Sequence, residues 1–338
     1  MKSLPTTYTA PGLVDVQVNG YAGFDFTSGS ERFSAEEFHR VRLALLRRGV
    51  VTILPTFTTD DSLDLLARAR RYSEIVSADR QLEEAFPRLH IEGPFISPVD
   101  GPRGAHPKAY CLIPRAMPDL IDRLHDASGG RVGLVTLAPE LPGAMDLIRR
   151  CRSRGIRVAI GHSQAPDETI AQAVEAGATL STHLGNGSHQ MLPRLSNYVQ
   201  TQLADDRLTA TFIADGHHMP LTTLKNFIRA KTPRRCILIT DAIGAAEMPP
   251  GVYFLGKQQV QLERSGRVSH PGQPNLAGSA LTMDQAILNV YLHCDVTWEE
   301  AWAMASTIPA SALGLPAPSA VTVEISEQGF RNSQAVTA

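Results

Sequence analysis

The strongest constraint on this 338-residue chain is a series of eight short, almost uninterrupted apolar segments that alternate with amphipathic ones. Continuous apolar runs are typical of strands buried on both faces, and such strands occur in parallel sheets that helices cover. Eight strand–helix units of this kind predict a closed (β/α)8 barrel in the α/β class. The expected strands are LVDVQV (13–18), VVTILPT (50–56), RLHIEGP (88–94), RVGLVTLAPE (131–140), IRVAIGHS (156–163), ATLSTHLGN (178–186), RLTATFIADG (207–216) and RRCILITDAIG (234–244).

The segments between these strands carry helix signals. The first begins with Ser34-Ala-Glu-Glu37, a capping-box pattern, and ends at Gly49. Apolar residues at helical spacing predict the remaining helices. These are expected at 61–79, 118–127, 142–154, 166–176, 194–205 and 220–231, with closing helices at 280–293 and 298–313.

The remaining segments look like additions to a single domain that spans 1–338. Residues 1–10 are polar and are expected to lie loosely on the surface. Residues 251–270 alternate between apolar and polar side chains, which predicts a small hairpin excursion. The polar tail 316–338 contains one strand-like run, VTVEI, and is expected to be partly mobile.

Composition narrows the function. A net charge of −2 offers no electrostatic footprint for nucleic acid or for an anionic membrane, so neither is an expected partner. The four cysteines have no C-x-x-C spacing, which indicates buried, reduced thiols. No signal core and no apolar run of about 20 residues is present, so we expect a cytoplasmic protein.

Polar residues stand at the ends of the expected strands, where barrels of this kind carry their reactive groups. One glutamate and two histidines on three different strands match a ligand set of open catalytic zinc sites. Such a metal activates a water molecule and polarises a carbonyl, and a nearby aspartate can accept the water's proton. The strand-end residues are Gln17, Asn19, Glu92, His162, His183, Asp215, His217, His218 and Asp241.

Each of these residues alone has a simpler interpretation. Ser163 next to His162 could cap the following helix, and an aspartate such as Asp241 before a turn is commonplace. Their coincidence at one level of one barrel favours a metal site. Gln17 and Asn19 are weak zinc ligands and argue against a second metal, although they could simply form the turn before Gly20.

Several motifs point further when they are taken together. PGLVDVQVNG, HIEGPF, GAH, GHS, THLGN, ADGHHM, ITDA and AGSALTM follow one another from about Pro11 to Leu313. As a set they resemble the N-acetylglucosamine-6-phosphate deacetylase family of the amidohydrolase superfamily. Many amidohydrolases carry a histidine pair on the first strand, where this chain has Gln17 and Asn19, similar to the single-metal branch of these deacetylases.

The resemblance implies a role for each site residue. Glu92, His162 and His183 would bind one divalent metal ion, with Zn2+ as the first choice and Fe2+, Co2+ or Mn2+ as alternatives that accept the same ligands. Asp241 would be the general base and acid, and His106 would help to hold the acetyl carbonyl. The residues expected on the substrate side are His218, Asn186, Gly187, Arg194, Gln17 and Asn19.

The resemblance also implies a homodimer with a shared active site. In the family, the phosphate-binding arginine reaches into the site of a neighbouring subunit, and Arg194 matches that position. An arginine fork can bind phosphate oxygens in a bidentate manner. A solvated surface arginine is the alternative interpretation of Arg194.

The chain departs from the family pattern in two places. It starts almost at the first strand and lacks the family's closing motif, so the usual β-sandwich is expected to be absent or reduced to the VTVEI run. The turn after His183 reads Asn-Gly-Ser where the family commonly has Asn-Ala-Met. Hydrolysis is therefore better supported than phosphate recognition.

The sequence thus predicts a TIM-like barrel of the amidohydrolase type, with little or no β-sandwich, that removes acetyl from an N-acetylated amino sugar. The expected substrate is N-acetylglucosamine-6-phosphate. One alternative keeps the chemistry but uses another N-acyl or cyclic amide without phosphate. The other is a barrel that binds a sugar phosphate without turning it over.

Overall fold

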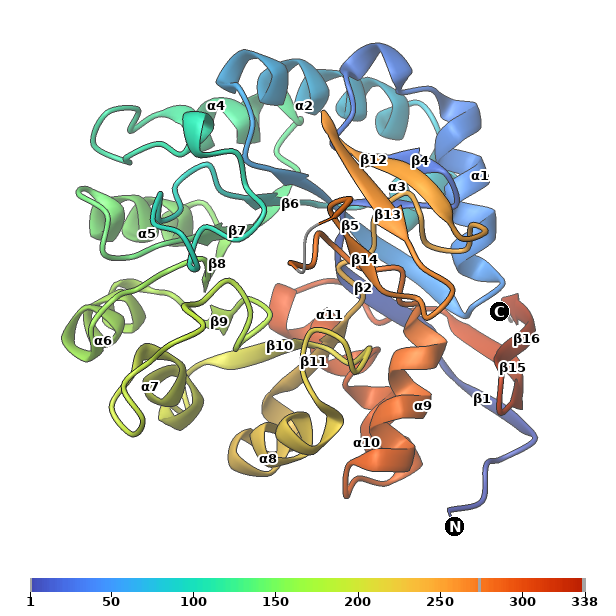
Figure 1. The fold of residues 1–338 in the computed structure, drawn as a ribbon. Helices are drawn as coiled ribbons and strands as arrows, with labels where there is room; N and C mark the ends of the chain where they lie inside the picture. Colours follow the sequence, from blue (N-terminus) through green and yellow to red (C-terminus); the bar gives the residue numbers. More distant parts are fainter. Residues whose placement is uncertain (1, 273–274, 336–338) are drawn as a thin grey trace.

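The structure is a computed structural model that describes residues 2–272 and 275–335. Eight parallel strands stand side by side in the order of the chain and form a nearly closed barrel (Figure 1). The prediction of a (β/α)8 barrel and all eight predicted strands are confirmed. The strands are β2 (Leu13–Val18), β5 (Val50–Thr58), β6 (Leu89–Glu92), β7 (Val132–Leu137), β8 (Arg157–Ile160), β9 (Leu180–Ser181), β10 (Thr209–Ile213) and β11 (Cys236–Ile239).

The first and last barrel strands meet at a seam that has no regular ladder. Val18 and Ala242 form a single parallel bridge. The backbone N–H of Asp241 donates to the Gln17 carbonyl at 3.0 Å. Deeper in the barrel, the Thr240 hydroxyl donates to the Asp15 carboxylate at 2.5 Å. A few backbone hydrogen bonds and the Thr240–Asp15 side-chain pair thus join β2 to the segment after β11.

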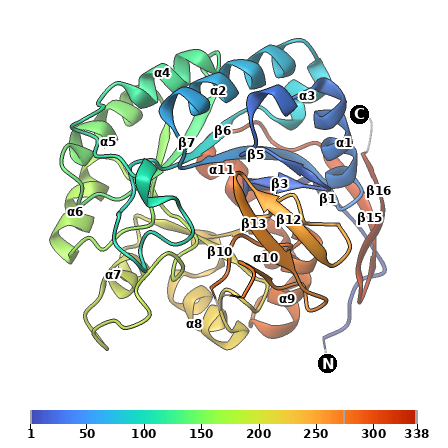
Figure 2. The ribbon, with the colours of Figure 1, turned by 45° about the horizontal axis from the view of Figure 1, so that its top comes forward.

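An outer ring of helices covers the barrel (Figures 1 and 2). Side-chain caps fix where several of these helices begin. At the first helix, for example, the Ser34 side chain accepts a hydrogen bond from the Glu37 N–H. The ring consists of α1 (Ala35–Leu46), α2 (Ser62–Ser77), α3 (Arg80–Ala85), α4 (Leu120–Ala127), α5 (Ala144–Ser153), α6 (Asp167–Ala176), α7 (Tyr198–Ala204) and α8 (Leu221–Lys231), followed by α9 (Met283–His293), α10 (Trp298–Ala303) and α11 (Thr307–Leu313). Short 3-10 turns lie at Ser30–Arg32, Lys108–Tyr110 and Pro233–Arg235.

Two of the predicted helices differ from the structure, and one helix was not predicted. The helix expected at 61–79 is α2, and it is followed by a separate α3, which Asp79 caps. The segment expected at 298–313 is divided into α10 and α11. The helix expected from 194 begins only at Tyr198, capped by Asn197, so Arg194 lies in the loop before it.

The excursion at 251–270 is a small antiparallel sheet with one strand more than the predicted hairpin. Its strands are β12 (Gly251–Leu255), β13 (Gln258–Leu262) and β14 (Val268–Ser269). The β12–β13 turn is held where the Gly256 N–H donates to the Asp25 carboxylate at 2.6 Å. Asp25 belongs to a two-stranded ribbon of β3 (Gly20–Tyr21) and β4 (Phe24–Asp25), which follows β2.

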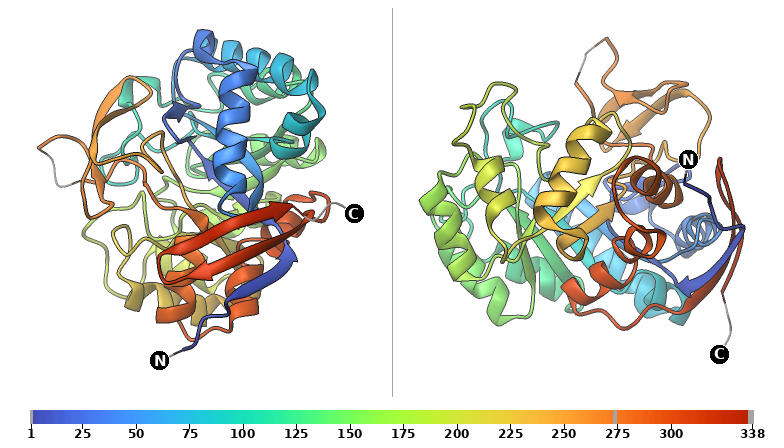
Figure 3. Two further views of the ribbon diagram at one scale, coloured as in Figure 1. Left: turned by 90° about the vertical axis from the view of Figure 1, so that its right-hand side faces the viewer. Right: turned by 90° about the horizontal axis from the view of Figure 1, so that it is seen from below.

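Part of the start that was expected to lie loosely (1–10) and much of the tail that was expected to be partly mobile (316–338) are in strands. β1 (Thr7–Pro11), β15 (Ala320–Ser326) and β16 (Gly329–Ala335) form an antiparallel sheet on the outside of the barrel (Figure 3). The VTVEI run lies in β15. Met1 and residues 336–338 lie outside the described residues.

Long-range pairing stabilises this terminal sheet, and for that reason local patterns do not reveal it. Val321 and Val323 are buried, and the ring of Phe330 stacks on that of Trp302, with centroids 5.6 Å apart. The Trp302 indole N–H also donates to the Pro11 carbonyl at 2.8 Å. None of the described helices is both long and apolar enough to cross a membrane.

Candidate metal centre

Four of the predicted site residues converge at the carboxyl end of the barrel. Glu92 is the last residue of β6, and His162, His183 and Asp241 each lie two residues beyond the end of β8, β9 or β11. Glu92, His162 and His183 are almost fully buried. The parallel barrel thus brings together side chains that are up to 149 residues apart in the sequence, as the sequence predicted.

The backbone is unusual at three of these positions. His162, His183 and Asp241 have φ values of 51°, 29° and 50°. This left-handed region is uncommon for residues other than glycine and costs on the order of 1–3 kcal/mol at each position. Such strain persists only where the surrounding structure imposes it, and it is found preferentially at functional sites. Its coincidence at three strand ends supports a functional role for this turn geometry.

The distances among Glu92, His162 and His183 fit a bound metal ion. Glu92 Oε1 lies 3.3 Å from His162 Nε2 and 3.1 Å from His183 Nε2, and the two histidine nitrogens are 3.1 Å apart. Ligands that bind zinc tetrahedrally at 2.0–2.1 Å stand about 3.3 Å apart. The three atoms therefore match one triangular face of a coordination tetrahedron.

The tautomer of His162 is also the one that a metal requires. Its Nδ1 lies 2.9 Å from the Pro102 carbonyl, which can only accept a hydrogen bond. The proton is therefore on Nδ1, and Nε2 presents a lone pair to the centre. Gly187 makes room for this ring, because a Cβ at that position would come within 2.7 Å of His162 Nδ1.

His106 lies at the edge of the same cluster. Its Nε2 is 3.2 Å from His162 Nε2 but 4.0 Å from the nearest carboxylate oxygen of Glu92. Ligand atoms of Glu92, His106 and His162 all lie within 4.8 Å of one another, so His106 is a second candidate ligand. Its greater distance from the carboxylate makes His183 the better third ligand, and it leaves His106 beside the metal position.

Asp241 is fixed by two amides that were predicted to lie on the substrate side. Its Oδ1 accepts hydrogen bonds from Asn19 Nδ2 at 2.7 Å and from Gln17 Nε2 at 3.1 Å. Gln17 Nε2 also donates to Glu92 Oε1 at 2.8 Å. The two amides therefore orient the carboxylates, whereas the sequence had assigned them to the substrate.

The pKa values of Asp241 and Glu92 are shifted in opposite directions. Burial raises the pKa of Asp241, and the nearby charge of Glu92 raises it further. Burial also acts to raise the pKa of Glu92, but hydrogen bonds from His162 and His183 outweigh it and hold that pKa well below its usual range. Burial lowers the pKa of His106 to about 3. Glu92 is thus a stable anion, while Asp241 is poised to take up a proton.

The AGSALTM segment holds the turn that carries Asp241. The Ser279 hydroxyl donates to the Thr240 carbonyl at 2.6 Å, and the Ser279 N–H donates to the Asp241 carbonyl at 3.1 Å. Gly278 lacks a side chain because a Cβ there would meet Ile243 at 2.3 Å. The motif therefore fixes the turn that carries Asp241.

His218 is oriented by a neighbouring carboxylate. Its Nδ1 lies 2.7 Å from Asp215 Oδ2, and Asp215 Oδ1 accepts the backbone N–H groups of His217 and His218. This arrangement fixes the His218 ring and keeps Nε2 available to a ligand. His217 instead lies 3.1 Å from the Ser265 carbonyl and makes no contact with the cluster.

The loop after β9 brings only some of the predicted residues to the centre. The Asn186 side chain donates to the His183 carbonyl at 3.2 Å, so it supports the turn of that histidine. Arg194 is exposed and has no side-chain partner among the described residues. Met191 and Leu195 in the same loop are 90% and 82% exposed. Within one chain, Arg194 therefore does not join the metal cluster.

The structure adds residues that the sequence analysis did not single out. Thr59 contacts His106, and His90 lies fully buried two residues before Glu92, where its Nε2 is 2.8 Å from the Thr136 hydroxyl. Burial lowers the pKa of His90 to about 4, so it is a neutral part of the barrel interior. Their signal in the sequence was a polar residue within or just after an apolar strand, the same signal that identified Glu92.

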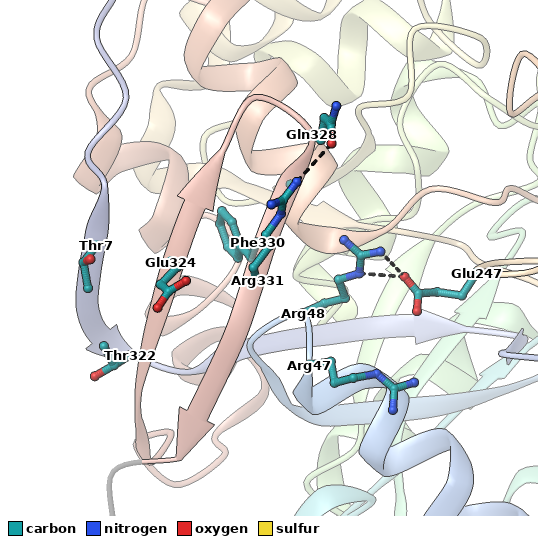
Figure 4. Close-up of a pocket in the computed structure, with 10 residues that line it drawn as sticks. Thr7, Arg47, Arg48, Glu247, Thr322, Glu324, Gln328, Phe330 and Arg331 are labelled. Carbon is teal, nitrogen blue, oxygen red and sulfur yellow. Dashed lines mark hydrogen bonds and ion pairs between the residues drawn. The ribbon is translucent and has the colours of Figure 1, made fainter.

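Of two cavities lined by described residues, one adjoins the cluster and the other lies apart from it. One of about 280 Å³ adjoins His106 and is lined by Thr59, Arg103, Tyr110, Lys257 and Gln258, among others. The other, of about 830 Å³, is an open groove between the terminal sheet and the end of α1 (Figure 4). In that groove Arg48 is already paired with Glu247, and it also forms a 3.0 Å ion pair with Asp284. The arginine in this groove is therefore already neutralised by carboxylates of the same chain.

Comparisons with known proteins identify the family of this chain. The amidohydrolase family model matches residues 8–319. N-acetylglucosamine-6-phosphate deacetylase from Lysinibacillus sphaericus is 34% identical over 91% of this chain and 77% of its own length. N-acetylgalactosamine-6-phosphate deacetylase from Escherichia coli O157:H7 is 32% identical over 90% of this chain and 78% of its own length.

A solved structure extends the likeness to the fold. A mutant N-acetyl-D-glucosamine-6-phosphate deacetylase from Mycobacterium smegmatis, in complex with N-acetyl-D-glucosamine-6-phosphate, has a TM-score of 0.87 and 29% identity, and the match covers 97% of this chain and 86% of that one. The chain is thus a hydrolase of amides that belongs to the amidohydrolase family, on the branch of the N-acetylglucosamine-6-phosphate deacetylases.

Proposed function

We propose that the protein hydrolyses the acetamide of N-acetylglucosamine-6-phosphate to acetate and the free amino sugar. The observation that carries the proposal is the triangle of Glu92, His162 and His183, with Asp241 held beside it by Asn19 and Gln17. The identity of the substrate is inferred from the names of the relatives and from the sugar phosphate that is bound in the Mycobacterium smegmatis structure.

Glu92, His162 and His183 would hold one divalent metal ion, in keeping with the metal dependence of the family. When bound, the ion supplies a Lewis acid that lowers the pKa of a water molecule and polarises the acetyl carbonyl. We assign zinc as the native ion, because two imidazoles and one carboxylate are a ligand set of open zinc sites.

Asp241 moves the proton in this scheme. Its Oδ1 is occupied by the amides of Asn19 and Gln17, so Oδ2 is the oxygen that takes the proton of the attacking water. The same oxygen then gives that proton to the departing amine, which completes the hydrolysis without net consumption of acid or base. His106 Nε2 donates a hydrogen bond to the carbonyl oxygen as negative charge develops there.

The sugar and its phosphate would be bound by residues around the mouth of the barrel. His218, oriented by Asp215, faces the substrate, and Asn186 and Gly187 form the wall after His183. Arg194 would bind the phosphate in the site of a second subunit. The exposure of Arg194 between Met191 and Leu195 supports a homodimer that this loop joins. A cytoplasmic location would fit a substrate that carries a phosphate.

The test is an assay of acetate release by the zinc-loaded protein. We expect turnover of N-acetylglucosamine-6-phosphate, much weaker turnover of the sugar without phosphate, and none after removal of the metal by a chelator. The N-acetylgalactosamine epimer, an N-acyl amino acid and a cyclic amide complete the substrate set. No acetate from either sugar phosphate, with a full complement of metal, would refute the proposal.

Asp241→Asn provides the matched variant. It preserves the shape of the side chain and leaves all three metal ligands in place, so metal content should be unchanged. Because a general base is lost, we expect turnover to fall on the order of 10³-fold. Near-normal turnover of this variant would remove Asp241 from the mechanism.

A further inference from the structure

Thr59 is a buried residue in contact with two parts of the metal centre. It follows the last residue of β5 and is 2% exposed. Its hydroxyl oxygen lies 2.9 Å from His106 Nδ1 and 3.5 Å from the Glu92 carbonyl. Gly93 makes this position available, since a Cβ on Gly93 would lie 2.2 Å from the Thr59 hydroxyl.

The single proton of this hydroxyl decides which nitrogen of His106 carries a hydrogen. If Thr59 donates to the Glu92 carbonyl, His106 must donate through Nδ1, and Nε2 then presents a lone pair to the centre. If Thr59 donates to His106 Nδ1, the ring proton lies on Nε2. The two arrangements make His106 either an acceptor or a donor towards the substrate.

Two observations favour the second arrangement. The contact of the Thr59 hydroxyl with Nδ1 is short at 2.9 Å, whereas the contact with the Glu92 carbonyl, at 3.5 Å, is at the limit of a hydrogen bond. Glu92 Oε2 also lies 4.0 Å from His106 Nε2, and an anion on that side favours the tautomer with its proton on Nε2.

We propose that Thr59 is a positioning residue that donates a hydrogen bond to His106 Nδ1 and so holds His106 as the tautomer that can donate to the substrate carbonyl. The inference rests on the proposed deacetylation, in which Nε2 meets a developing oxyanion. An oxyanion can be stabilised only by a donor, so the wrong tautomer would oppose the reaction.

The position of the His106 loop does not depend on Thr59. Arg103 Nη1 donates to the His106 carbonyl at 2.7 Å, and Gln258 Nε2 donates to the Ala105 carbonyl at 3.1 Å. These contacts hold the backbone on both sides of the peptide bond that joins Ala105 to His106. Loss of the Thr59 hydroxyl should therefore change which nitrogen of the His106 ring carries the proton, and it should change the position of the ring much less.

The experiment compares Thr59→Val, which removes the hydroxyl at nearly constant volume, with Thr59→Ser, which keeps it. Thr58→Val is the control, because Thr58 lines the same cavity and its side chain makes no hydrogen bond with a described residue. We expect Thr59→Val to lower kcat about tenfold or more, with KM and metal content within about twofold of the wild type. Thr59→Ser and Thr58→Val should stay within about threefold of the wild-type kcat.

A spectroscopic measurement on the wild type tests the same point without a variant that must fold. Nitrogen chemical shifts of 15N-labelled histidine distinguish the two neutral tautomers, and comparison with His106→Asn assigns the signal. A proton on Nε2 in the wild type supports the proposal, and a proton on Nδ1 overturns it. Normal kcat in folded, metal-loaded Thr59→Val also overturns it.

Loss of metal from Thr59→Val would likewise overturn the proposal, because His106 would then be a ligand that Thr59 orients. The failure of the proposed function is distinguishable from all of these outcomes. In that case the wild-type protein itself would release no acetate, whatever the tautomer of His106.

Discussion

Asn19 is one of two neutral amides, with Gln17, that lie beside the candidate metal ligands. Its Nδ2 donates to Asp241 Oδ1 at 2.7 Å, and this hydrogen bond lowers the pKa of Asp241 against the effect of burial and of Glu92. The amide thus stabilises the charged form of Asp241. Asn19 therefore adjusts the pKa of the carboxylate that we propose as the general base.

Replacement of Asn19 by leucine tests this role through pH. The variant loses a donor to the carboxylate, so the pKa of Asp241 should rise further. A base works when deprotonated, and the acid limb of kcat/KM lies at the pKa of the base in the free enzyme. We expect this limb to move to higher pH, with metal content unchanged. A pH profile with an unchanged limb, or one that moves to lower pH, would contradict this role.

The barrel strands were predictable because burial on both faces leaves a local signature of consecutive apolar residues. The same rule located Glu92, His162, His183 and Asp241, since each follows such a run. The terminal sheet was not predictable in this way. Thr7 pairs with Glu324, and the apolar residues of β15 are stabilised by contacts that no local pattern records.

The finer parts of the site also depend on distant contacts. The sequence placed Gln17 and Asn19 at the right end of β2, but their partners are side chains more than 70 residues away. Thr59 contacts His106 only because the loop after β6 brings that histidine next to it, and the local sequence does not reveal this contact. Strand ends can thus be read from sequence, whereas the hydrogen bonds between them cannot.

The seam between β2 and β11 offers a test at the level of elements. Asp15 is fully buried there and accepts hydrogen bonds from the Thr240 hydroxyl and from backbone N–H groups. Burial nevertheless raises its pKa from 3.8 to about 7. The folded protein therefore holds a proton on Asp15 at pH values where the unfolded chain has lost it.

The direction in which pH changes the stability of the fold follows from the extra proton that the folded state binds. The contribution of Asp15 to stability is fully present below about pH 4 and is lost as pH rises to about 7, by on the order of 4 kcal/mol. Asp15→Asn should remove this dependence. Urea unfolding of both proteins between pH 5 and pH 8 measures it. Equal slopes of stability against pH in both would show that Asp15 is ionised throughout.

The loop that precedes α7 carries the features from which we expect the protein to form a homodimer. Met191 and Leu195 expose large apolar side chains on either side of Arg194. Exposed apolar residues grouped in this way are typical of surfaces that bind another protein. A second copy of the chain is the partner that would also place Arg194 near a phosphate.

Two substitutions separate assembly from phosphate binding. Leu195→Asp should convert a dimer to a monomer in sedimentation, because a charge would be buried at the interface. Arg194→Ala should leave the dimer intact and raise KM about tenfold or more for N-acetylglucosamine-6-phosphate, with little change for the sugar without phosphate. A monomeric wild type, or equal effects of Arg194→Ala on both sugars, would exclude a shared site.

The terminal sheet has a consequence for how the chain folds during its synthesis. β1 is made before the barrel, yet its partner β15 begins only at Ala320. The first strand must therefore wait, unpaired, while nearly the whole barrel is translated. Trp302, whose ring stacks on Phe330 of β16, also comes late in the chain. The strand pairs of the terminal sheet can therefore form only after the barrel segments between them have been made, and we expect this sheet to be among the last parts of the fold to close.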